Sequence, residues 1–173
     1  NLAEAALRES DLLAFQIAIE PGKPGAVMPG YNLVNGHYAS ENAFLLQQVL
    51  KDEWGYAGWV MSDWGATHST VKAALAGLDV QSGANLDDAH YFGQTLRDAV
   101  REGQVPQSRI DDMVARILTG LISVGALDQA LLDDRMQPVD FSQHKLIAQR
   151  QAEEGIVLLT NRNATLPLPQ RLA

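Results

Sequence analysis

Short apolar segments alternate with segments of helical spacing along most of this chain, and this alternation limits the possible folds more than any other feature. Three apolar segments, residues 26–28, 59–61 and 78–80, predict strands. Strands that are connected through helices run parallel, and strands that are apolar on both faces are buried on both sides. The sequence therefore predicts an α/β fold with a parallel sheet, in either a barrel or a doubly wound arrangement.

The helices expected around these strands are marked by apolar residues three or four positions apart. We expect them over residues 2–19, 45–53, 68–76 and 88–102, and from Ser108 to about residue 121. Ser108 is expected to cap the last helix, and residues 85–87 the helix before it. The last helix carries an apolar stripe that we expect to be continuously buried, formed by Ile110, Met113, Val114, Ile117, Leu118 and Leu121.

The length of the chain bears on its domain organisation. A complete eight-stranded barrel needs roughly 250 residues, whereas this chain has 173, so three strands would be the closing third of such a barrel. Residues 124–141 carry acidic residues without a clear period and predict a linker. Beyond them, residues 142–154 predict a helix and residues 156–159 a buried strand, which would begin a second α/β unit.

Composition argues against several classes of partner. The formal net charge of −8 and the sequence pI of about 4.8 disfavour nucleic acid and anionic membranes, which bind through clustered Lys and Arg. No apolar run approaches the roughly 20 residues that span a bilayer. The absence of cysteine excludes disulfides, thiol nucleophiles and thiolate metal sites. Because the start lacks both Met and a signal-peptide pattern, we expect the natural N-terminus to lie upstream.

The loops that follow the predicted strands hold the candidate functional residues, because functional groups in parallel α/β folds gather at the C-terminal ends of strands. Asp63 directly follows the strand at 59–61, and Trp64 follows Asp63. This pair suits a sugar, whose CH faces stack on aromatic rings and whose oxocarbenium-like transition state is stabilised by a carboxylate. From position alone, Asp63 could equally be a loop or capping residue, and Trp64 a core residue.

No metal or cofactor site is expected. His37 and His68 lie in different loops without the spacing of metal ligands, so exposed or capping roles are expected for them. The glycines form neither a Gly-x-Gly-x-x-Gly nor a Walker pattern, so nucleotide binding has no support.

Four motifs in order identify a family resemblance. They read Val27-Met28-x-x-Tyr31-Asn32-x-Val34-Asn35-Gly36, Glu41-Asn42, Trp54-Gly55-Tyr56-x-Gly58 and Val60-x-Ser62-Asp63-Trp64-Gly65. Together they resemble the barrel of glycoside hydrolase family 3 enzymes of the β-glucosidase type. The resemblance continues through residues 77–80, 99–118, 154–159 and 166–168, and so covers essentially the whole chain.

By this resemblance the chain is an internal fragment of such an enzyme. Residues 1–123 would be the C-terminal part of a (β/α)₈ barrel of the TIM type, residues 124–141 a linker, and residues 142–173 the first elements of an α/β sandwich domain.

The resemblance also implies roles for single residues. Asp63 would be the nucleophile of a retaining reaction, Trp64 would form a wall of the sugar site, and the Tyr31 hydroxyl would hydrogen-bond the carboxylate or the sugar. The alternative for Tyr31 is a buried core position.

Three further positions within the motifs are expected to be structural. For Met28 the alternatives are a place beside the sugar subsite and a core position, and the sequence favours the core. Glu41 and Asn42 are expected to cap the helix that follows them. The pair Gln81-Ser82 departs from the Glu-Met of many family members, so contacts at the end of the third strand are expected to differ.

The implied activity is that of a retaining exo-β-glycosidase acting on non-reducing terminal β-linked glucose, with β-xylosidase as the alternative specificity. A small carbohydrate and the rest of the parent chain are the expected partners, without a cofactor, and a periplasmic or secreted location fits the resemblance. A retaining enzyme also needs a second carboxyl group about 5 Å from the nucleophile, and none of the carboxylates here matches the family's acid. The alternative is therefore a catalytically incomplete fragment that binds sugar weakly at most.

Overall fold

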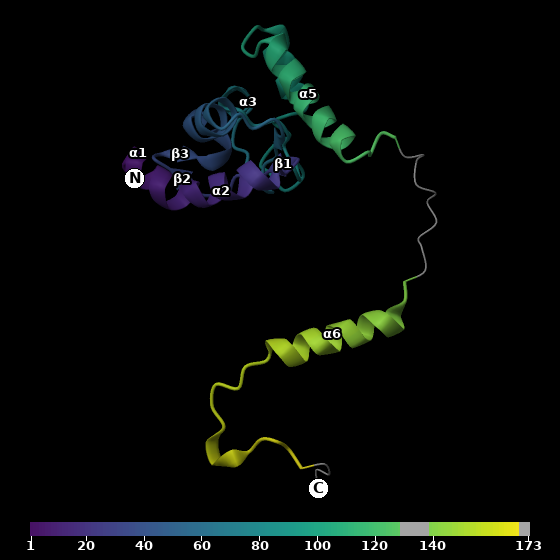
Figure 1. The fold of residues 1–173 in the computed structure, drawn as a ribbon. Helices are drawn as coiled ribbons and strands as arrows, with labels where there is room; N and C mark the ends of the chain where they lie inside the picture. The colour runs from purple at the N-terminus through teal and green to yellow at the C-terminus, as the bar shows by residue number, and fades with distance from the viewer. Residues whose placement is uncertain (129–138, 170–173) are drawn as a thin grey trace. The chain divides into compact units, whose positions relative to one another are not determined.

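The computed structural model describes residues 1–128 and 139–169. The chain forms two compact units, Asn1–Ala130 and Leu131–Ala173, and each is considered by itself (Figure 1). The predicted linker falls across the boundary between these units, and its residues 129–138 lie outside the described residues.

The three predicted strand segments form one short parallel arrangement in unit 1. Strand β1 (Ala26–Val27) pairs in parallel with β4 (Trp59–Val60), residue for residue from the first position of each. A parallel bridge then joins Met61 to Val80. Residues 78–80, the third predicted strand, are called the third strand below and are distinct from β3. The predicted α/β character and parallel pairing are confirmed, although the strands are shorter than expected.

A small antiparallel hairpin follows β1, in a segment for which the sequence analysis predicted no strand. Strand β2 (Leu33–Val34) pairs with β3 (His37–Tyr38) across the dipeptide Asn35-Gly36. Both turn residues have positive φ, 49° and 85°, as the favoured two-residue hairpin turns require. The expectation that His37 lies in a loop was therefore wrong, and the Asn-Gly pair was the signal that identifies the hairpin.

Helices surround these strands in unit 1, with α2 along one side and α3 on the opposite side (Figure 1). In chain order they are α1 (Glu4–Leu7), the π-helical η1 (Arg8–Leu12), α2 (Leu13–Gly22), the 3₁₀ turn η2 (Ala39–Glu41), the π-helical η3 (Phe44–Glu53), α3 (Val71–Ala76), α4 (Gln94–Arg101) and α5 (Gln107–Ser123). Every helix predicted for this unit is present, and α3 and α4 are shorter than predicted.

The caps expected for α4 and α5 are wrong. Helix α5 follows Pro106, whose missing N–H suits a helix start, and Ser108 lies inside the helix. Residues 85–87 do not cap α4, because the Asp87 carboxylate instead accepts a hydrogen bond from the side-chain amide of Gln81. The loop between the third strand and α4 is consequently longer than the sequence suggested.

The apolar stripe of α5 is only partly buried. Met113 is 4% exposed, whereas Val114 and Leu118 are 49% and 41% exposed. The expectation of a continuously buried stripe was therefore wrong. Within the described residues, only the face of α5 that packs on Leu96 and Val105 is covered.

Two apolar clusters form the core of unit 1. The first joins α2, η3, β4 and α3, and consists of Ile19, Leu46, Leu50, Tyr56, Val60, Ala73 and Leu78. The second joins α3, α4 and α5, and consists of Ala74, Leu96, Ala99, Val105 and Met113. The contacts of α3 with both clusters place it between the sheet and the later helices.

A buried charge network connects these clusters. The Asp79 carboxylate accepts hydrogen bonds from Lys51 Nζ at 2.8 Å, from Arg109 Nη2 at 2.7 Å and from the backbone N–H of Val60 at 2.8 Å. The side chains of Lys51 and Asp79 are fully buried. Burial is the main cause that lowers the pKa of Lys51 to about 8, while the attraction of Asp79 opposes that shift.

In its described residues, 139–169, unit 2 contains the helix α6, the short 3₁₀ turn η4 and otherwise extended chain. Asp140 caps α6 (Phe141–Gly155) by accepting hydrogen bonds from the N–H groups of Ser142 and Gln143. Residues 156–159 form no strand in the described part of the chain and are 57–90% exposed, so the predicted buried strand was wrong. A buried strand needs a neighbouring strand, and the described residues supply none here. The turn η4 (Arg162–Ala164) follows.

Among residues 1–128 and 139–169, no helix combines the length and the apolar character needed to cross a bilayer.

Replacing Asp79 with asparagine is expected to destabilise unit 1 by about 3–5 kcal/mol, because the buried Lys51 loses its close counter-charge. Arg109 keeps only the half-exposed Asp112, which lies 4.0 Å from Lys51. Hydrogen–deuterium exchange of the full-length protein would show faster exchange in peptides that cover residues 58–82. Asp98→Asn is the matched control, since it breaks an exposed pair with Arg101 and costs under about 1 kcal/mol. Equal protection in the two variants would contradict the central role of Asp79.

Candidate active site

Asp63 lies where the parallel strands end. The N–H of Met61 donates to the carbonyl of Val27 at 3.0 Å, and the N–H of Ser62 donates to that of Val80 at 3.0 Å. Asp63 is the next residue and is partly exposed. Because the two hydrogen bonds fix the backbone on both sides of this strand, the carboxylate emerges from a rigid part of the fold.

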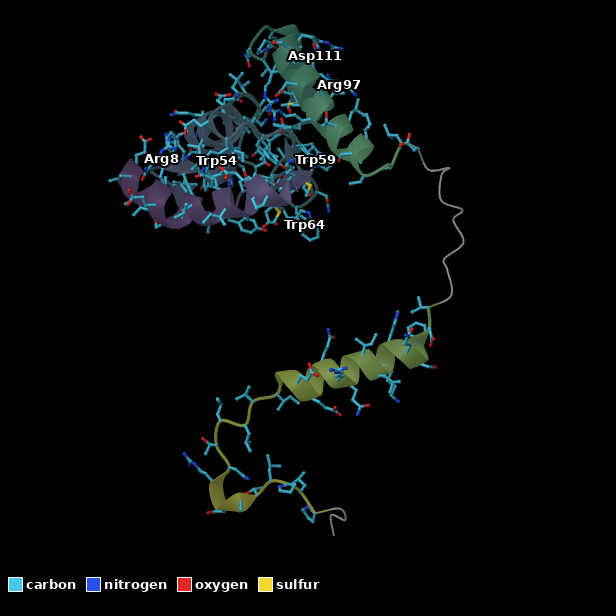
Figure 2. All side chains as sticks on the ribbon, viewed as in Figure 1. Arg8, Trp54, Trp59, Trp64, Arg97 and Asp111 are labelled. Carbon is cyan, nitrogen blue, oxygen red and sulfur yellow. The ribbon has the colours of Figure 1, made fainter. Side chains whose placement is uncertain are left out.

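Trp64 projects from a left-handed turn at the edge of unit 1 (Figure 2). Trp64 has φ of 43° and Gly65 has φ of 71°. Non-glycine residues adopt such values rarely, and they often do so at functional sites. The indole is 58% exposed, so the structure does not place Trp64 in the core, and its ring is available to a ligand.

Tyr31 lies close to Asp63. The pKa of the Tyr31 phenol is raised, first by the hydrogen-bonding interaction with the Asp63 carboxylate, then by partial desolvation, and then by the charges of Asp63 and Asp87. Tyr31 is 54% exposed, which differs from the buried alternative. The structure therefore brings Tyr31 and Asp63 together, from the loop after β1 and the loop after β4.

The loop after the third strand is organised by Gln81. Its side-chain amide donates to the Asp87 carboxylate and, at 2.9 Å, to the carbonyl of Ala89, while its Oε1 accepts from the N–H of Phe92 at 2.9 Å. The sequence marked Gln81 only as a departure from the family pattern. Its position directly after a strand was the signal for this role.

Of the pair Glu41-Asn42, which was predicted to cap the following helix, only Asn42 does so. Asn42 accepts a hydrogen bond from the N–H of Leu45 at 3.2 Å, which confirms it as a cap of η3. Glu41 is 5% exposed and its Oε2 lies 3.3 Å from Lys72 Nζ, so it forms an ion pair rather than a cap.

Met28 is 52% exposed in the described residues, so the expectation of a core position was wrong. It borders a hollow of about 350 Å³ between α2, the β2–β3 hairpin and η3. The lining of this hollow does not include Tyr31, Asp63 or Trp64, so it is separate from the candidate active site.

The two histidines of the early loops contribute no metal site. His68 stacks on Tyr38 with ring centroids 3.8 Å apart, and His37 lies in β3. Within the part of the chain that the structure describes, no three His, Cys, Asp or Glu side chains gather where they could hold a metal ion.

Comparison with known proteins shows similarity to glycosyl hydrolases of family 3. Residues 1–120 match the family model described as the glycosyl hydrolase family 3 N terminal domain. The probable beta-glucosidase L of Aspergillus fumigatus is 38% identical over 192 residues, which cover 100% of this chain and 25% of that protein. The chain thus spans about a quarter of the length of that relative.

Solved structures give the same result. The β-D-glucoside glucohydrolase from Trichoderma reesei matches with a TM-score of 0.76 and 38% identity, over 96% of this chain and 24% of that one. β-Glucosidase 3B from Thermotoga neapolitana, solved in complex with glucose, matches with a TM-score of 0.75 and 34% identity, over 97% of this chain and 24% of that one.

Asp63→Asn is expected to lower the pKa of Tyr31 toward its usual value of 10.0, because a neutral amide no longer opposes ionisation of the phenol. The ¹³Cζ signal of labelled tyrosine in the full-length protein, assigned with Tyr31→Phe, would report the titration. Asp87→Asn should lower that pKa by less, since Asp87 contributes only its charge. A Tyr31 pKa that responds more to Asp87 than to Asp63 would contradict the proximity described above.

Proposed function

The chain belongs to glycoside hydrolase family 3, and from that premise we propose that the protein containing it is a retaining exo-β-glycosidase. Its substrate would be a small carbohydrate with a non-reducing terminal β-linked glucose. The observation that carries this proposal is the grouping of a strand-end carboxylate, Asp63, with the phenol of Tyr31 and the exposed indole of Trp64. The β-glucosidase names of the similar proteins favour glucose over xylose as the sugar.

In this proposal Asp63 forms a covalent intermediate. A carboxylate oxygen of Asp63 attacks the anomeric carbon as the bond to the leaving oxygen breaks, and a glycosyl ester results. Water then attacks the same carbon from the opposite side of the ester bond, releases the sugar and restores the carboxylate. Two inversions at one carbon leave the β configuration unchanged.

Tyr31 and Trp64 would support this chemistry without joining the bond changes. The pKa of Tyr31 is raised, so its hydroxyl stays protonated at neutral pH and can donate to the carboxylate or to a sugar hydroxyl. The indole of Trp64 offers an apolar face next to the reacting carboxylate, where a sugar or aryl ring can stack.

The departing alcohol also requires a proton, and we assign no donor within this chain. We propose that a carboxyl group from outside these 173 residues supplies it and, once deprotonated, takes a proton back from the water that attacks the glycosyl ester. The matched span of about a quarter of the relatives' length is consistent with that assignment. The isolated chain would then bind sugar weakly at most and would not hydrolyse it.

We also propose that the two units correspond to two domains of the parent enzyme. Residues 1–123 would be the last strands and helices of the catalytic (β/α)₈ barrel, residues 124–141 a linker, and residues 142–173 the start of an α/β sandwich domain. The parallel pairing of β1 with β4 and the family match over residues 1–120 support the first assignment.

The nucleophile can be identified by trapping. The full-length enzyme, incubated with a 2-deoxy-2-fluoro β-glucoside that forms a slowly hydrolysed ester, is expected to carry the label on Asp63 in peptide mass spectrometry. Asp63→Asn should lower kcat at least about 1000-fold, as removal of a catalytic nucleophile does. Asp52→Asn, at an exposed carboxylate on η3, is the control with unchanged activity. A label on another residue would refute the assignment.

A further inference from the structure

The indole of Trp64 is attached to the loop after the third strand. Its Nε1–H donates to the hydroxyl oxygen of Ser82 at 3.1 Å. Trp64 is 58% exposed and has φ of 43°, so neither burial nor a common backbone conformation holds the ring in place. The contact with Ser82 therefore restricts an indole that would otherwise have several rotamers available.

Ser82 is itself fixed to the strand that carries Asp63. Its backbone N–H donates to the hydroxyl oxygen of Ser62 at 3.0 Å. Ser62 is fully buried and immediately precedes Asp63. The hydrogen bonds thus run from Ser62 through Ser82 to Trp64, and they contact the chain on both sides of Asp63.

Gly83 completes the contact. A Cβ atom at this position would lie 2.5 Å from Trp64 Cδ1 and 2.9 Å from Trp64 Nε1. The indole therefore lies directly against the backbone of Gly83, and any larger residue would displace it. Gly83 has φ of 61°, and its carbonyl accepts a hydrogen bond from the N–H of Leu86 at 2.7 Å, so the backbone here is also held.

We propose that Ser82 and Gly83 are positioning residues that hold the Trp64 indole in one orientation beside Asp63. The substrate then meets a ring face that is already arranged, and no part of the binding energy is used to order it. This inference rests on the proposed function, because it takes Trp64 to contact the substrate. It is particular to the Gln81-Ser82-Gly83 sequence of this chain, since only a hydroxyl or a similar acceptor at position 82 can bind the indole N–H.

A double-mutant cycle in the full-length enzyme tests the role of the Ser82 hydroxyl. Ser82→Ala is expected to lower kcat/KM for an aryl β-glucoside about fivefold, mainly through KM, because one exposed hydrogen bond is lost. Ser82→Thr keeps a hydroxyl and should stay within about twofold of the native enzyme. In a Trp64→Phe background, which has no indole N–H, Ser82→Ala should change kcat/KM less than about twofold. A full fivefold loss in that background would overturn the proposal.

Gly83→Ala tests the close approach. It is expected to lower kcat/KM at least about tenfold through displacement of the indole, together with the strain of a positive φ. Gly103→Ala is the matched control, because Gly103 has φ of 74° but open space around its Cβ position. The control carries the same backbone strain without a displaced ring and should retain activity. Equal losses in the two variants would show that strain alone accounts for the effect, and the proposal would fail.

A readout independent of catalysis separates this proposal from the proposed function. The full-length protein with 5-fluorotryptophan would give a ¹⁹F signal for Trp64, assigned with Trp64→Phe. Ser82→Ala and Gly83→Ala should shift or broaden this signal, and Gly103→Ala should leave it unchanged. An unaltered Trp64 signal in Ser82→Ala would overturn the positioning role, even where the fluoroglucoside labels Asp63. An altered signal without any labelling of Asp63 would support the positioning role and count against the proposed glycosidase function.

Discussion

The buried carboxylate of Asp79 is the interaction on which unit 1 depends. It binds Lys51 of η3 and Arg109 of α5, and it accepts a hydrogen bond from the backbone of Val60 in β4. Helix α5 lies far along the sequence from η3 and β4, and Asp79 connects it to both. Asp112 of α5 adds a second, half-exposed carboxylate, which lies 2.8 Å from Arg109 and 4.0 Å from Lys51. The Asp79 side chain therefore holds η3 and α5 against β4, and it helps to align β4 with residues 78–80.

That alignment determines the geometry of the candidate active site. The N–H of Asp79 donates to the carbonyl of Val60 at 2.9 Å, and the N–H of Ser62 donates to the carbonyl of Val80 at 3.0 Å. Both strands consequently end at the same level, and the residues that follow them, Asp63 and Ser82, emerge side by side. The proposed catalytic role of Asp63 and the proposed positioning of Trp64 both depend on this strand register.

Features that depend on a local sequence pattern could be predicted from the sequence alone. Apolar runs located the three strand segments, and position after a strand singled out Asp63 and Trp64. The hydrogen bond between Trp64 and Ser82 could not be predicted, because it joins residues 18 positions apart and depends on the strand register and on an unusual φ at Trp64. The exposure of Val114 and Met28 was missed for a related reason, since burial depends on a partner surface and not on the residue alone.

The exposed run Ile156-Val157-Leu158-Leu159 has a consequence for the colloidal behaviour of the isolated polypeptide. Four consecutive β-forming or leucine residues without charge, proline or glycine resemble the segments that pair between molecules and start aggregation. The N–H of Ile156 donates to the carbonyl of Ala152 at 3.1 Å, whereas the backbone N–H groups of residues 157–159 donate to no other backbone group of the described residues. We therefore expect this segment to limit the solubility of the separated chain, and we expect shielding it to help keep the polypeptide monomeric at high concentration.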